Sequence, residues 1–387
     1  MPDKGEIQEK RRAPGFMKTM PVPCLEPIIK MQESRPAEGA APGIVYPPLD
    51  MNTILELTYS NAFHTQCISL KADMAVGLDF DAPKEVEKFL DEISGTDSFL
   101  DILHRVAFDW ECVGNGALEI ARDAHGNIGE IYHVHGHTLY VRTDGNSLAG
   151  YEQYADIPVE FDVFGTRGER NEILHFKRYT PFSTWYGLPE WVAALEALRL
   201  DQQKKIFYSS FFNNFAIPAL AVVLQGAEFD DDTEKRLQRG FENMKGTKNS
   251  FRTLLLSVPF ENAEIKFEKL MADFKDMPFD KLTQATREEI LAAHGTPPRL
   301  VGIVTAGSLG GESEADAQLR NFVACKIRPR MKYLERRVHL LLRDAGLPEE
   351  FALKGICPEA IQPEGQKPEA GTSAAVLAKI FNERGSL

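Results

Sequence analysis

The feature that most constrains this chain is a helical pattern of unusual length, which begins at Pro189 and continues to about Ile217. Proline suits the first position of a helix because its missing N–H is not needed there. Roughly 28 residues at about 1.5 Å of rise each would make a rod on the order of 40 Å long. A helix of that length exceeds the needs of a compact domain, so the sequence predicts a strut. The ends of the pattern are apolar and its middle is polar: Trp191, Leu195, Leu198, Phe207, Phe211, Phe212 and Phe215 against Arg199, Asp201, Gln202, Gln203, Lys204 and Lys205.

The net charge of −13 limits the partners that the whole chain can bind tightly. Proteins that grip duplex DNA usually carry a surplus of lysine and arginine, because phosphate contacts supply the affinity. An acidic chain is therefore not expected to grip DNA, although DNA could slide past its surface. No apolar run is long enough to span a bilayer, and no apolar segment follows the charged N-terminus to make a signal peptide.

The cysteines indicate a reducing compartment. Five occur among 387 residues, they are widely spaced, and no C-x-x-C pair is present. Free thiols explain this pattern best. The five are Cys24, Cys67, Cys112, Cys325 and Cys357.

The first half of the chain predicts an α+β fold. Residues 1–50 are rich in proline, charge and small residues, which favours an extended or disordered arm. A helix is expected from Leu55 to Val76, and two further helices follow, the second ending at Gly114-Asn115-Gly116. The period then changes to two, which predicts a small antiparallel sheet with helices on one side. Its expected strands are Ala117–Arg122, Ile128–Val134, Leu139–Thr143 and Ile173–Tyr179.

The second half predicts a smaller β unit between long helices. Strands are expected at Ala219–Leu224, Arg252–Ser257 and Glu264–Glu268, with a helix near Asp230. A helix from about Pro278 to Ala293 comes next, and a glycine-rich loop occupies 302–311. A last long helix, Ser313 to Asp344, must kink at Pro329.

Several local sequences, read in order over about residues 50 to 345, resemble the portal proteins of tailed phages, most closely the PBSX-like group of temperate phages with contractile tails. The matching segments are Val113-Gly114-Asn115-Gly116-Ala117-Leu118-Glu119-Ile120, Trp185-Tyr186-Gly187-Leu188-Pro189-Glu190 with Ala193-Ala194-Leu195, Asn243-Met244-Lys245-Gly246 with Leu254-Leu255-Leu256, Ile290-Leu291-Ala292-Ala293-His294-Gly295-Thr296-Pro297-Pro298, and Gly307-Ser308-Leu309-Gly310-Gly311-Glu312 with Phe322 and Ile327-Arg328-Pro329.

This resemblance implies a domain division. After the arm at 1–50 would come a wing (51–187), a first stem helix (188–217), a clip (218–269), a second stem helix (270–294), a tunnel loop (295–313), a kinked wing helix (314–345) and a short crown or C-terminal tail (346–387). The pattern of apolar residues supports one part of this division. Two long helices that are apolar over only part of their length need partners, and identical neighbours in a ring supply them.

The resemblance also implies a function. The chain would form a ring of twelve subunits at one capsid vertex of the virion, assembled in the bacterial cytoplasm, through which DNA is packaged and ejected. Its partners would be the terminase large subunit, capsid and scaffold proteins, a head–tail connector protein and, transiently and without sequence preference, double-stranded DNA. No enzyme activity, cofactor or membrane is implied.

The candidate functional residues fall into two groups. The first is a loop that would contact DNA in the channel: Thr305, Gly307, Ser308, Leu309, Gly310 and Gly311. The second would lie between subunits: Phe207, Phe211, Phe212, Arg328, Arg330 and Arg336. The basic residues could equally form a solvated helix face, or meet Asp230-Asp231-Asp232 or Glu312-Glu314-Asp316 of a neighbour; direct DNA contact comes third.

Other patterns point to chemistry less strongly. His133, His135 and His137 alternate near the end of an expected strand, as zinc ligands can, but Gly136 interrupts them and no carboxylate with metal spacing lies nearby in the sequence. The glycine-rich loop lacks the lysine of a P-loop. Asp109 and Glu111 are interpreted as surface charge. The alternative class is a metal-dependent nuclease or nucleotidyl enzyme; we predict no catalytic or metal site.

Overall fold

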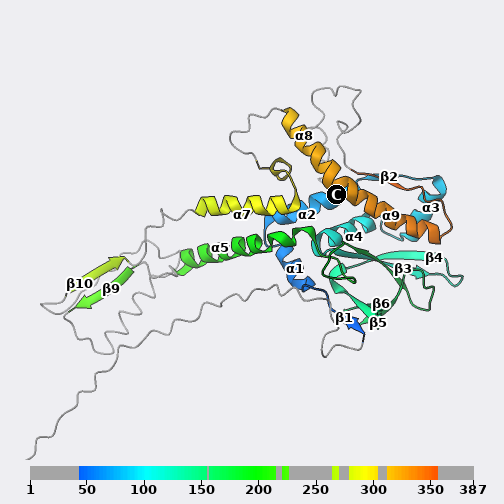
Figure 1. The fold of residues 1–387 in the computed structure, drawn as a ribbon, viewed down its shortest axis with the longest axis horizontal. Coiled ribbons are helices and arrows are strands. Elements are labelled where there is room, and N and C mark those ends of the chain that lie inside the picture. Colours follow the sequence, from blue (N-terminus) through cyan, green and yellow to red (C-terminus); the bar gives the residue numbers. More distant parts are fainter. Residues whose placement is uncertain are drawn as a thin grey trace, which may run out of the picture.

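The computed structural model describes residues 43–154, 157–214, 220–225, 264–269, 279–303 and 312–355. An α+β body occupies one end of the molecule, and two helices leave it side by side (Figure 1). This arrangement confirms the expected fold class and the expected strut. Within the described residues, no helix is both long and apolar enough to cross a membrane.

The body contains a seven-stranded sheet in the order β1-β5-β6-β7-β8-β3-β4. Its neighbours are antiparallel except β7 and β8, which are parallel, so the expectation of a purely antiparallel sheet is wrong at that pair. The four expected strands are present, and the short strands β1, β6 and β7 were not expected. The bounds are β1 Ile44–Val45, β3 Asn115–Arg122, β4 Ile128–Val134, β5 Leu139–Asp144, β6 Ser147–Gln153, β7 Val159–Val163 and β8 Glu172–Lys177.

Helices cover one face of this sheet. α4 (Phe99–Val113) packs on β3 and β4, and α2 (Ala62–Val76) packs on α4. The single helix expected from Leu55 to Val76 is wrong. Asn61 interrupts it because its side chain accepts a hydrogen bond from the His64 N–H and caps α2. The preceding helix is α1 (Met51–Thr58), and α3 (Lys84–Ile93) packs against β4.

The projecting pair consists of α5 (Leu195–Asn214) and α7 (Phe279–His294), which contact each other along their length (Figure 1). The α-helix starts later than expected, because Pro189 leads first into a 3-10 helix, Glu190–Ala194. Twenty residues in α5 correspond to about 30 Å. Beyond the far ends of the pair lies an antiparallel ladder of β9 (Leu220–Gln225) and β10 (Glu264–Lys269). The sequence predicts these two strands but not their pairing.

The last long helix is divided where the sequence predicts a kink. α8 (Glu312–Phe322) runs into a π-helical turn, Val323–Ile327, and α9 (Arg328–Asp344) continues in a different direction (Figure 1). Pro329 lies in the first turn of α9, where no N–H is required. After α9, β11 (Ala352–Lys354) pairs with β2 (Asp79–Asp81) and closes the body.

Some expected elements fall outside the described residues. These are the arm up to residue 42, the strand Arg252–Ser257, the helix near Asp230, the loop at 304–311 and the tail from 356. The three cysteines inside the described ranges, Cys67, Cys112 and Cys325, are free thiols.

Candidate functional site at the base of the projecting helices

Six charged side chains meet where the projecting helices join the body. They come from α2, α4, the end of β8, the 3-10 helix before α5, the π-helical turn and α9. We call them the junction cluster: Lys71, Glu111, Arg178, Glu190, Lys326 and Arg330.

Glu111 is the centre of the junction cluster. Its side chain is 2% exposed, and its carboxylate lies 2.6 Å from Lys71 Nζ. It accepts hydrogen bonds from Arg330 Nε at 2.7 Å and from Arg178 Nη2 at 2.5 Å. Burial alone would raise the pKa of Glu111, but the charges of Lys71, Arg330 and Arg178 hold that pKa well below its usual range. The carboxylate is therefore ionised and fully partnered.

Glu190 supplies the second carboxylate. It accepts a 2.5 Å hydrogen bond from Arg330 Nη2 and a further one from Lys326. Burial acts to raise the pKa of Glu190, and the Arg330 and Lys71 charges outweigh it, so the pKa is lowered. Arg330 thus bridges two carboxylates, one from α4 and one from the start of the segment that becomes α5.

A pair of buried histidines joins α2 to the end of α7. His64 Nδ1 lies 2.8 Å from His294 Nε2, and the His64 ring stands edge-on to Trp191 with the ring centroids 4.3 Å apart. Burial, reinforced by the Lys71 charge, lowers the pKa of His64 to about 3 and lowers that of His294 as well. Both rings are therefore neutral at physiological pH, and the pair is held by a hydrogen bond.

Two of the segments that carry the sequence resemblance meet beside this cluster. Asn115 Nδ2 donates to the Gly187 carbonyl at 3.0 Å, and Gly187 N–H donates back to Asn115 Oδ1 at 2.8 Å. Gly114 has φ +76°, and a Cβ there would lie 2.5 Å from the backbone carbon of Leu188. Only glycine allows this close approach. The two motifs therefore fix where the chain leaves the sheet for the projecting helices.

The histidine pair and the junction cluster together hold the helices on both sides of the glycine-rich loop. α7 ends at His294, beside α2, and the helix after the loop contributes Lys326 and Arg330. A Cβ on Gly295 would lie 2.4 Å from Lys326 Cε, so the two sides also approach each other directly. The His64–His294 pair thus anchors α7 and the junction cluster anchors the helix after the loop, and α2 contributes a residue to each, His64 and Lys71.

The predicted channel residues, Thr305 and Gly307 to Gly311, lie outside the described residues. Among the predicted interface residues, Phe207 is half-buried on α5, while Arg328 and Arg336 are exposed on α9. Phe211 and Phe212 belong to α5, but their side chains are not described. For Arg330 the prediction is wrong: its side chain is 6% exposed because it faces Glu111 and Glu190 of its own chain.

The interpretation of Asp109 and Glu111 as surface charge is also wrong. Glu111 anchors the junction cluster, and Asp109 lies 2.9 Å from His133 Nε2. Sequence reasoning missed Lys71 and Glu190 as well. A signal was available, because Glu111 falls four residues after Ala107 and eight after Leu103 on the apolar stripe of α4. A charged residue within such a stripe indicates a buried partner.

The fold and the junction cluster together define an elongated α+β subunit whose long helices are anchored in the body at one end. A comparison of the sequence with models of known protein families then assigns the chain to one family. The model described as "Phage portal protein" matches residues 83–364. Because this match covers more than half of the chain, the protein belongs to the phage portal protein family, as the sequence resemblance predicts.

Individual relatives agree with that assignment. The "Probable portal protein" of Haemophilus phage HP1 is 22% identical over 268 residues, which cover 68% of this chain and 72% of that protein. The protein of the same name from Escherichia phage P2 is 29% identical over 140 residues, or 35% of this chain and 40% of that protein. An uncharacterised protein of Rickettsia bellii is 27% identical over 177 residues, so the chain spans about half of its length, 45%.

Solved structures share the fold. A chain in the virion of a native gene transfer agent particle superimposes with a TM-score of 0.59 at 20% identity, covering 90% of this chain and 92% of that chain. A chain in the neck of that particle, computed with C12 symmetry, gives the same TM-score at 19% identity, with 90% and 93% covered. These likenesses show that this chain shares its α+β fold with chains of that particle.

Proposed function

We propose that twelve copies of this chain form the portal ring at one vertex of a phage capsid, and that genomic DNA passes through its axial channel. Family membership supports the proposal, as does the C12 symmetry of the neck in which the similar chain is found. In this ring, residues 51–187 and 314–345 would be the wing, α5 and α7 the stem, and the β9–β10 ladder part of the clip.

The observation that carries the proposal is the apolar surface that α5 leaves uncovered. Ile206 is 60% exposed and Leu200 is 39% exposed, although both lie on a helix that already packs against α7. Moving large apolar side chains out of water lowers the free energy, and identical neighbours around a ring would cover these two side chains. Exposed Arg328 and Arg336 would meet acidic residues of a neighbour in the same assembly.

The glycine-rich loop would line the narrowest part of the channel. Its sequence carries four glycines between Gly302 and Gly311 and no cation, so it would present Leu309 and backbone amides to passing DNA. Such a surface would let DNA slide without holding its phosphates. Because the His64–His294 pair anchors α7 and the junction cluster anchors the kinked helix, a movement of the loop would be transmitted to both helices.

The remaining partners follow from this place in the virion. The ring would form in the bacterial cytoplasm with capsid and scaffold proteins, dock the terminase large subunit during packaging, and later hold the head–tail connector. The chain itself would hydrolyse nothing. The narrower kinship with the PBSX-like group is part of this proposal.

The experiment that tests the function replaces Gly307 and Gly310 with valine, or deletes Ser308-Leu309-Gly310, in particles assembled with the variant subunit. Ring assembly and procapsid formation should be unchanged, while the length or retention of packaged DNA should fall. Full-length genomes that are packaged and retained would make the loop a plain connector. If the variants fail to form rings, the loop has a structural role and its assignment to the channel is wrong.

A further inference from the structure

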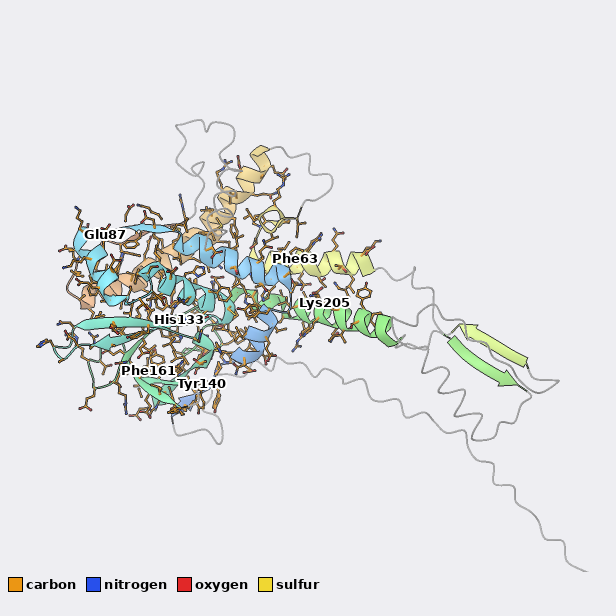
Figure 2. All side chains as sticks on the ribbon, turned by 180° about the vertical axis from the view of Figure 1, so that it is seen from behind. Phe63, Glu87, His133, Tyr140, Phe161 and Lys205 are labelled. Atoms are coloured by element: carbon orange, nitrogen blue, oxygen red, sulfur yellow. The ribbon has the colours of Figure 1, made fainter. Side chains whose placement is uncertain are left out.

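Three side chains with metal-binding atoms converge on the outer part of the body, away from the junction cluster. Asp109 comes from α4, His133 from β4, and His135 is the residue between the end of β4 and a 3-10 helix, Gly136–Thr138. One ligand atom from each lies within 4.8 Å of the other two. Figure 2 labels His133, which belongs to strand β4 of the sheet. The sequence places no carboxylate close to these histidines. The fold supplies one, because Asp109 of α4 lies beside His133 although it is 24 residues earlier in the chain.

The spacing of these atoms fits one small cation. Asp109 Oδ2 is 2.9 Å from His133 Nε2 and 3.9 Å from His135 Nδ1. Ligands about 2.0–2.1 Å from a tetrahedral zinc ion are separated from each other by about 3.3 Å. These two distances lie on either side of that value, and the ligand atoms of His133 and His135 are within 4.8 Å of each other. Rotation of the largely exposed His135 side chain would adjust the separations to those around one ion.

The surrounding structure holds two ligands firmly and leaves one side open. His133 and Asp109 have side chains only 8% and 15% exposed, whereas that of His135 is 63% exposed. Asp109 Oδ2 also accepts a 2.9 Å hydrogen bond from the Gly136 N–H, which fixes the carboxylate. A surface pocket bordered by Thr96, Arg105, Tyr132, His133 and His135 gives solvent access to the imidazoles.

We propose that Asp109, His133 and His135 bind one divalent transition-metal ion, with zinc as the best match. Two neutral imidazoles and one carboxylate suit zinc, and water from the pocket would complete a tetrahedral site. On binding, His133 Nε2 gives up its hydrogen bond to Asp109 and carries its proton on Nδ1 instead. Asp109 keeps the Gly136 N–H as its second partner, an arrangement that orients metal ligands.

The ion would stiffen the edge of the sheet. β4 is the last strand in the sheet order, and within the part of the chain that the structure describes its one strand neighbour is β3. A metal held by α4 and by the end of β4 would tie this edge strand to the helix that also carries Glu111 of the junction cluster. This role goes beyond the proposed portal function and does not depend on it.

The test is a zinc titration of the full-length, tag-free protein by calorimetry, with Co²⁺ absorption as a spectroscopic check on coordination. We expect one ion per chain, a higher thermal unfolding temperature with zinc present, and at least about tenfold weaker binding in His135→Ala. His135 is largely exposed, so this variant should fold normally. Asp109→Asn should show the same loss, reported by the change in the Co²⁺ spectrum.

Two matched variants separate this site from other zinc-binding groups. His125→Ala removes an exposed histidine in the β3–β4 turn, and Cys325→Ser removes the exposed thiol; both should bind zinc as the native chain does. The proposal is overturned if native protein binds zinc no more tightly than His135→Ala, which would leave Asp109 and His133 as a hydrogen-bonded pair only. It is also overturned if Cys325→Ser abolishes binding.

Discussion

Glu111 is buried almost completely and is ionised only because cations surround it. A buried ion pair adds little stability over an apolar replacement, but breaking it leaves uncompensated charge that is costly. The junction cluster brings four cations to two carboxylates, so each carboxylate counters more than one positive charge. Removing either carboxylate is therefore expected to destabilise the body more than removing an exposed acid.

We expect Glu111→Gln to lower the free energy of unfolding by about 3–5 kcal/mol, because Lys71 and Arg330 then lose their shared counter-charge in a buried site. Urea denaturation followed by circular dichroism measures the loss. The control is Glu92→Gln, which removes an exposed partner of Lys88 and should change stability by less than about 0.5 kcal/mol. Equal effects in the two variants would contradict the role given to the cluster.

The buried histidines predict a loss of stability in mild acid. The pKa of His64 is 6.5 when exposed and about 3 in the fold, so the unfolded chain binds a proton that the folded chain refuses. This contribution is complete above about pH 6.5 and is lost as pH falls toward 3. At pH 5 the loss of stability from this one group amounts to about 2 kcal/mol.

The pH dependence can be measured by urea unfolding at pH 7 and pH 5. His64→Gln should lose less stability between these two pH values than the native chain, by about 2 kcal/mol. The comparison concerns the difference between pH values, so any constant cost of the substitution cancels. The exposed-site variant His125→Ala should keep the native dependence. An unchanged pH dependence in His64→Gln would show that His64 is not held neutral.

The partners of individual side chains were the feature that the sequence predicted least well. Arg330 was expected on a surface and Asp109 and Glu111 in solvent, yet each has a buried or half-buried partner more than 20 residues away in the chain. Side-chain partners of that kind depend on which helices pack together, which periodicity along one segment does not reveal. The position of Glu111 on an apolar stripe was the one local clue.

Helices and strands were predicted more reliably, because their apolar spacing and end signals are local. The ends of α4 and α7, the strands β9 and β10, and the kink near Pro329 all follow from glycine, proline and periodicity. The errors lie where a side chain overrides the pattern, as Asn61 does between α1 and α2, or where strands are short. β7 has only five residues and pairs in parallel, which alternation alone cannot indicate.

The projecting pair gives a prediction at the level of one element. Ile206→Asp places a charge on the exposed apolar face of α5, and it should raise the subunit concentration needed for ring assembly at least about tenfold. The circular dichroism spectrum of the subunit should not change, because Ile206 is not part of its core. Analytical ultracentrifugation over a concentration series measures the assembly.

The matched control is Gln203→Asp, which adds the same charge to an exposed polar position on the same helix. It should assemble as the native chain does if the effect comes from the apolar contact. Equal weakening by both substitutions would assign the effect to charge on the stem, and normal assembly of Ile206→Asp would remove α5 from the interface.

For the whole molecule, the family was predicted from short sequence segments. The structural role of these segments can be seen only in the fold. The motif around Gly114 and the motif around Gly187 meet and exchange hydrogen bonds, and together they aim the projecting helices away from the sheet. The structure of a single subunit does not contain the ring. It has to be inferred from exposed apolar residues on α5 and from the family to which the chain belongs.

The most direct test is therefore the mass of the purified full-length protein, measured by multi-angle light scattering after size exclusion at physiological salt. A closed portal ring should give about twelve times the 43.3 kDa subunit mass, in a single peak whose mass does not change on dilution. A stable monomer at micromolar concentration would contradict the proposal that this chain assembles into a portal ring.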